Sequence, residues 1–154
     1  MVALSLAALH FAIRERHSRV EHWHMLLPGL FAVAASVTIV AFPRVSDLWE
    51  PQRLIIAMFA LLVGVARGRF MRLASDRIYG LAVLRYSTDS IVVATVLAAT
   101  AALDMVLDFL ARGLTPMTST IELAQIVASA YLLGRSVTLW MHVRTSAHVD
   151  LVNT

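Results

Sequence analysis

The sequence predicts an all-α membrane protein, a bundle of about five transmembrane helices with a small surface β-hairpin between the third and the fourth. Apolar residues make up 59% of the 154 residues, whereas soluble domains contain about 45–50%. The mean hydropathy of +0.75 agrees with this excess. All 13 basic residues are arginines, and most of them occur in short segments between long apolar runs. No Ser-, Gly- or Pro-rich linker divides the chain, so we expect one integral membrane domain, 1–154.

Five apolar runs are candidates for membrane spans. A spanning helix needs about 20 mainly apolar residues. The charge-free parts of the first and third runs are shorter than this, so these two helices span only if the flanking arginines extend toward the membrane surface. The fourth and fifth runs carry charged residues in their interiors. The expected helices cover about residues 2–18, 24–43, 50–67, 88–111 and 118–144.

The segment between the third and fourth helices, about 69–86, does not follow the helical pattern. Two stretches compatible with β-structure, Phe70 to Ala74 and Ile78 to Leu84, flank Ser75-Asp76. Asp tolerates the left-handed backbone of a two-residue turn, although the usual Gly is missing. We therefore expect a hairpin at the membrane surface, and the alternative is an amphipathic helix lying in the interface.

The arginines are distributed unequally between the loops. The first and third loops together hold most of them, while the second holds two beside two acidic residues and the fourth holds only Arg112. Loops rich in Lys and Arg stay in the cytoplasm. We therefore expect the first and third loops and the C-terminus to be cytoplasmic, and the N-terminus to lie outside.

Composition and motifs exclude several functions. The pI near 10.2 does not indicate a nucleic-acid partner, because the arginines form no basic face with interleaved aromatic residues. The absence of Cys excludes disulfides and thiolate metal sites. The chain contains no nucleophile elbow, phosphate loop or zinc-protease motif, so we do not expect an enzyme.

Polar residues inside the fourth and fifth spans are the main candidates for a site. Asp104 and Asp108 share one helix face, because they are four residues apart, and Thr100 extends this face by a turn. A carboxylate within the membrane is a functional candidate by default. On the fifth span Glu122, Gln125 and Ser129 follow one another at near-helical spacing and face the same stripe if the two helices are antiparallel.

Two interpretations of these residues remain open. They form a proton, cation or polar-ligand site, or they form an ion pair that holds two helices together. If the two spans are antiparallel, Arg135 lies about one helical turn from the depth of Asp104, within reach of a long side chain. The direction is less favourable, because Arg135 lies about 80° around the helix from Gln125, which marks the face expected to meet Asp104. Asp104 and Arg135 are therefore the predicted pair under the second interpretation, and both interpretations stay open.

Histidines offer a second and weaker candidate site. All six lie at or near the expected cytoplasmic face. A haem would need two imidazoles on different helices at the same depth, such as His10 with His24 or His142, and a metal ion could use His22 and His24. These spacings are not diagnostic, so no cofactor is expected, and haem or metal binding stays open.

The order of features along the chain gives a resemblance to a known family. Short sequences mark the first loop, both ends of the second span and the segment before the fourth. They are Ile13-Arg14-Glu15-Arg16, Leu26-Leu27-Pro28, Phe42-Pro43, Arg69-Phe70, Ser75-Asp76-Arg77-Ile78-Tyr79 and Arg85. In these positions the chain resembles the CcdC-like family of small bacterial integral membrane proteins, which is associated by name with cytochrome c biogenesis. The resemblance implies an accessory protein of the bacterial inner membrane and no catalytic residues.

The expected function follows from these points. The first hypothesis is a non-enzymatic accessory or interaction protein that contacts the lipid bilayer and associates with other membrane proteins or with itself. Small residues at four-residue spacing, such as Ala60 and Gly64 or Ala130 and Gly134, suit close helix packing within or between chains. The alternatives are a small oligomeric transporter or channel that uses the intramembrane polar residues, and a haem or metal carrier.

Overall fold

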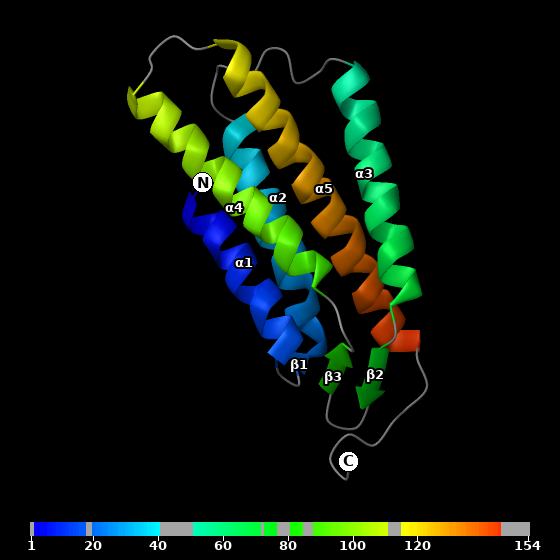
Figure 1. The fold of residues 1–154 in the computed structure, drawn as a ribbon. Coiled ribbons are helices and arrows are strands. Elements are labelled where there is room, and N and C mark those ends of the chain that lie inside the picture. Colours follow the sequence, from blue (N-terminus) through cyan, green and yellow to red (C-terminus); the bar gives the residue numbers. More distant parts are fainter. Residues whose placement is uncertain are drawn as a thin grey trace.

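The protein is a bundle of five α-helices with a small sheet at one end (Figure 1). The computed structural model describes residues 2–17, 20–40, 51–71, 73–76, 81–84, 88–110 and 115–145. The five predicted helices are confirmed, and their ends agree with the prediction to within one helical turn wherever the structure describes them. The helices are α1 (Val2–His17), α2 (Leu27–Val40), α3 (Pro51–Phe70), α4 (Asp89–Leu110) and α5 (Thr115–Thr145).

Local chemistry fixes where several of these helices begin. Pro51 is the first residue of α3, and Pro28 and Pro116 lie in the first turns of α2 and α5. Proline is favoured there, because its fixed φ suits a helix and the missing N–H would have had no partner in the helix. Asp89 begins α4, and its carboxylate is stabilised by the positive end of the helix dipole.

Helix α5 lies at the centre of the bundle and packs against α2, α3 and α4, while α1 packs against α2 and α4. Helices α1, α3 and α5 run in one direction, and α2 and α4 run in the other (Figure 1). The ion pair between Arg53 and Glu122 near one end of α3 and α5 confirms that these two helices are parallel, because Gly68 and Arg135 meet near the other end.

Glycines bring α3 and α5 into direct contact. A Cβ atom added at Gly64 would collide with the backbone carbonyl oxygen of Tyr131, and one added at Gly134 would collide with that of Leu61. A Cβ added at Gly68 would lie 2.9 Å from the carbonyl oxygen of Arg135. The small residues that the sequence marked for close packing therefore act within the chain at this interface.

Small apolar side chains also form the centre of the bundle. The main buried cluster is drawn from α1, α2, α4 and α5, and alanine is its commonest residue, which allows the four helices to approach closely. A second cluster joins α5 to the sheet. The main cluster consists of Ala8, Ala12, Ala32, Ala94, Leu97, Ala128 and Leu132, and the second consists of Met25, Ala82, Leu139 and Val143.

The sheet has three antiparallel strands in the order β1 (Val20–Glu21), β3 (Leu81–Leu84) and β2 (Leu73–Asp76). Strands β2 and β3 form a hairpin in the segment where the sequence predicted one. The predicted turn at Ser75-Asp76 is wrong, because both residues belong to β2 and Asp76 pairs with Leu81. The connection between the two strands therefore follows Asp76 and lies outside the described residues. A short 3-10 helix, η1 (His22–Leu26), follows β1.

One described helix, α4, contains a stretch long and apolar enough to cross a membrane by length and composition alone, Asp89–Leu107. The described parts of α1 and α2 have 16 and 14 residues, fewer than the about 20 residues that a spanning helix needs. Helices α3 and α5 carry several polar or charged residues. The expectation of about five membrane spans therefore stays a prediction.

Candidate functional site

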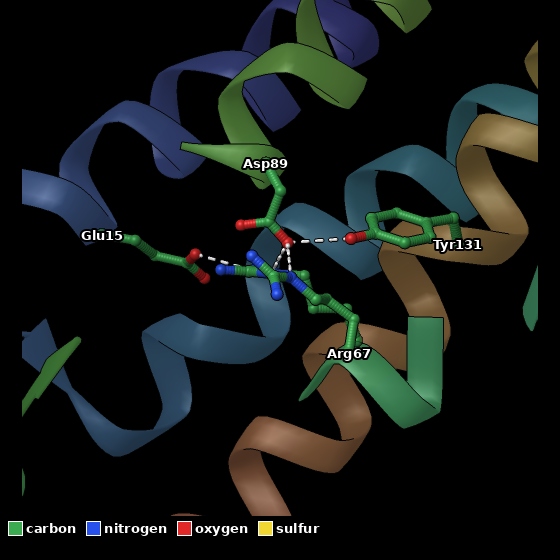
Figure 2. Close-up of polar contacts among 5 residues, drawn as sticks. Glu15, Arg67, Asp89 and Tyr131 are labelled. Carbon is green, nitrogen blue, oxygen red and sulfur yellow. Dashed lines mark hydrogen bonds and ion pairs between the residues drawn. The ribbon is translucent and has the colours of Figure 1, made fainter. Parts of the chain in front are cut away.

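A cluster of charged side chains lies inside the bundle near the end that carries the sheet. Figure 2 shows side chains from α1, α3, α4 and α5 converging on one point. Glu15 comes from the last turn of α1, Asp89 from the start of α4 and Arg67 from the last turn of α3. Tyr131 and Arg135 both come from α5 and are four residues apart, so they share one face of that helix. We call these five residues the charged cluster.

Arg135 is the most deeply buried member of the charged cluster. Its side chain has no exposed surface, and Glu15 is almost fully buried as well. Nη1 of Arg135 donates a hydrogen bond of 3.0 Å to Oε2 of Glu15. On its other side, Nε of Arg135 lies 3.5 Å from Oδ2 of Asp89, which is close enough for an ion pair but not aligned as a hydrogen bond. Arg135 therefore joins α5 to both α1 and α4.

Asp89 connects the buried part of the charged cluster to the outside. Its Oδ2 accepts a hydrogen bond of 2.8 Å from the Tyr131 hydroxyl and one of 3.4 Å from Nε of Arg67 (Figure 2). The Arg67 side chain is 54% exposed, whereas that of Asp89 is 20% exposed. One carboxylate oxygen thus bridges a buried and an accessible guanidinium.

The charges of the cluster balance one another. Two arginines face two carboxylates, and an isolated charge in an apolar interior would be strongly unfavourable. Breaking one side of such a buried pair is far more destabilising than the pair itself is stabilising. The cluster can therefore hold four helices at a fixed depth, and Arg67 is the member best placed to interact with a molecule from outside.

The predicted pair between Asp104 and Arg135 is wrong. Arg135 lies beside Asp89, the first residue of α4. Asp104 is fifteen residues further along the same helix, which at 1.5 Å per residue places it about 22 Å away. The prediction counted residues from the expected cytoplasmic end of each helix, the start of α4 for Asp104 and the end of α5 for Arg135, and treated these counts as depths in the membrane. In the structure α5 extends well beyond the start of α4 at the sheet end (Figure 1), so equal distances from those ends are not equal depths.

The polar stripe predicted on α4 is found only in part. Asp104 is half-buried, and the side chain of Asp108 lies outside the described part of the structure. The Thr100 hydroxyl donates to the carbonyl oxygens of Val96 and Leu97 in its own helix. Thr100 is therefore satisfied by the backbone, and the role predicted for Asp104 stays a prediction.

The residues predicted on α5 lie in two different environments. Glu122 forms an ion pair of 3.8 Å with Arg53 of α3, at the end of the bundle opposite the sheet. Gln125 is fully buried, and neither atom of its amide has a hydrogen-bond partner in the described part of the chain. The Ser129 hydroxyl donates to the Gln125 carbonyl oxygen and also meets the hydroxyl of Ser36 on α2. Of the predicted set, Gln125 remains the strongest candidate for a polar site inside the bundle.

The predicted histidine ligands are spread over three elements. His10 of α1 and His24 of η1 both lie against the ring of Phe11, with centroid distances of 5.5 and 6.4 Å. His24 also stacks on Trp23. His22 and His142 are partly buried on η1 and α5. Among the described residues no three His, Cys, Asp or Glu side chains are grouped as metal ligands, and haem or metal binding stays a prediction.

Sequence reasoning missed four of the five members of the charged cluster. Glu15 entered the sequence analysis only as part of the first loop, and no role was predicted for Arg67, Asp89 or Tyr131. The available signal was the spacing of Tyr131 and Arg135, which places a hydroxyl and a guanidinium on one face of α5. An acidic residue that directly begins an apolar helix, as Asp89 does, is a natural partner for such a face.

Comparison with known proteins adds no relative. The chain matches no known protein-family model, no curated protein and no solved structure. The resemblance to the CcdC-like family therefore stays a prediction.

Proposed function

We propose that the chain is an integral protein of the inner (cytoplasmic) membrane that acts without catalysis, as an accessory subunit of a larger membrane complex. Support for the membrane comes first from α4. Only 22% of its apolar stretch Asp89–Leu107 is buried inside the molecule. The core helix of a soluble protein would be mostly buried, so this helix is better explained by contact with lipid.

The other helices support the same placement. Each of the five α-helices carries large apolar side chains on its outer surface, and a membrane would satisfy all of them at once. Examples are Leu6 and Ile13 on α1, Leu30 and Val37 on α2, Leu54, Met58 and Leu62 on α3, Val92 and Met105 on α4, and Met141 on α5.

The accessory role is carried by one observation, the one-sided packing of α3. Its buried residues are Ala60, Gly64 and Gly68, which face α5. Its outer side carries Met58 and Leu62, which are 66% and 59% exposed. Helices in membranes associate by close packing rather than by a hydrophobic driving force. A helix attached along a single small-residue face leaves its other faces for a partner, and we propose a transmembrane helix of another protein as that partner.

Site-specific crosslinking in cells tests this proposal. A photoreactive amino acid placed at Met58 of α3 should form an adduct with one discrete membrane protein. The matched control is Met105 of α4, which is equally exposed at 66% and should react with lipid alone. The accessory role would be wrong if neither position captured a discrete protein and the chain purified from membranes alone. An adduct of twice the mass of the chain would instead assign the α3 face to self-association.

A further inference from the structure

An apolar groove runs between α3, α4 and α5. Its volume is about 450 Å³, and Phe59 and Val63 of α3, Val93 and Val96 of α4, and Val127 and Tyr131 of α5 are among its lining residues. Helices α3 and α4 lie on either side of α5 (Figure 1), which leaves the surface of α5 as the floor of the groove. The volume is in the range of sites for small ligands.

The groove ends at the exposed part of the charged cluster. Tyr131 lines the groove with its ring, and its hydroxyl reaches Asp89. Arg67 lies one helical turn beyond Val63 and shares its face of α3, so the guanidinium is placed at the end of the groove. Figure 2 shows Arg67, Asp89 and Tyr131 meeting at this point. The groove is therefore apolar along its length, and the accessible guanidinium of Arg67 lies at one end.

We propose that this groove binds one acyl chain of an anionic phospholipid, with the phosphate of the headgroup held by Arg67. The inference rests on the membrane placement proposed above and on charge complementarity at the end of the groove. An apolar groove alone would not select a lipid, because lipid chains are as apolar as the side chains that line it. Selection must come from the headgroup, and basic pockets between helices on the cytoplasmic side are suited to anionic headgroups.

The guanidinium of Arg67 can bind a phosphate while it keeps its contact with Asp89. Its contact with Asp89 uses Nε, whereas a guanidinium has five N–H donors arranged as a fork. The two terminal nitrogens suit a pair of phosphate oxygens. Asp89 lies within ion-pair distance of Arg135 as well as Arg67 and accepts a hydrogen bond from the Tyr131 hydroxyl, and these donors reduce its repulsion of an anion.

Lipid binding to the purified full chain tests the inference. The protein is extracted in a neutral detergent, and its affinities for phosphatidylglycerol and phosphatidylcholine with identical acyl chains are compared by native mass spectrometry. We expect the anionic lipid to bind about tenfold more tightly, the scale of one hydrogen bond to a charged group. Arg67→Gln should remove this preference and Arg67→Lys should keep part of it. The matched control Arg69→Gln removes the same charge from the other side of α3 and should leave the preference intact.

A second pair of variants tests the groove itself. Val96→Phe should fill the groove and weaken binding of both lipids, whereas Val106→Phe, at a similarly exposed position on α4 that does not line the groove, should not. The inference is overturned if the two lipids bind equally, if Arg69→Gln acts as strongly as Arg67→Gln, or if the groove proves to be closed by a second copy of the chain. A chain that is not extracted from membranes at all would instead contradict the membrane placement, so the two failures are distinguishable.

Discussion

Arg135 is held in the interior of the bundle by carboxylates from two different helices. Removal of one carboxylate leaves a guanidinium that cannot lose its proton and cannot reach water, since its side chain has no exposed surface. The loss of folding stability therefore depends on the cost of the buried, unpaired guanidinium rather than on the strength of the lost contact.

Glu15→Ala should therefore destabilise the protein strongly. Breaking one side of a buried ion pair costs about 3–5 kcal/mol, and we expect about 3 kcal/mol here because Asp89 stays beside Arg135. Unfolding of the purified protein by a denaturing detergent measures the change. Glu21→Ala is the control, because Glu21 is exposed and its contacts with Trp23 and His24 lie at the surface; it should change stability by less than about 1 kcal/mol. Glu15→Ala combined with Arg135→Ala should cost less than the sum of the single changes, and additivity would show that the two side chains do not interact.

At the scale of elements, the interface between α3 and α5 depends on the absence of side chains. Gly64 and Gly134 each face a backbone carbonyl of the opposite helix, and a backbone atom cannot move aside as a flexible side chain can. The two helices can be this close only while both positions are glycine.

Gly64→Ala should weaken the attachment of α3. Overpacking costs about 1–3 kcal/mol, and the collision with a backbone oxygen puts Gly64→Ala at the upper end of this range, about 3 kcal/mol. The higher helix propensity of Ala offsets about 1 kcal/mol, so we expect a net loss of about 2 kcal/mol. The same unfolding measurement applies. Ala66→Leu adds more bulk to the exposed side of α3 and should have almost no effect. Equal stability of Gly64→Ala and the wild type would mean that the two helices are not in backbone contact.

The sequence was sufficient to predict the five helices, because long apolar runs separated by arginines and marked by prolines leave few alternatives. The hairpin was placed correctly, but its turn was not, since Ser75-Asp76 has the composition of a turn while the pairing of Asp76 with Leu81 puts the connection later. The partner of Arg135 could not be predicted. It depends on how far α5 extends beyond the start of α4, and this offset is set by packing rather than by any local pattern.

At the scale of the whole molecule, the direction of the helices gives the bundle two chemically different ends. The sheet end holds Arg14, Arg67, Arg69 and Arg144, while at the opposite end the described part of α3 and α5 carries Arg53 paired with Glu122. This asymmetry agrees with the loop arginines of the sequence. On the positive-inside rule we therefore propose that the sheet end and the C-terminus are cytoplasmic.

Labelling of single cysteines can test this orientation, because the natural chain contains no Cys. Gln52 and Thr120 are exposed and lie near the Arg53–Glu122 pair, whereas Arg69 and Thr145 are exposed at the sheet end. In intact cells whose outer face is accessible, a membrane-impermeant maleimide should label Gln52→Cys and Thr120→Cys. It should reach Arg69→Cys and Thr145→Cys only after the membrane is opened.

The pattern of labelling separates two kinds of failure. Labelling of Thr145→Cys but not Thr120→Cys in intact cells would reverse the orientation while leaving the spanning helix α5 in place, and the arginine argument would then be wrong. Labelling of both positions from the same side would mean that α5 does not cross the membrane. Its 31 residues cover about 46 Å at 1.5 Å per residue, enough to cross a hydrocarbon core of about 30 Å with the sheet end left in the cytoplasm. The four positions should therefore divide into two pairs, one on each side.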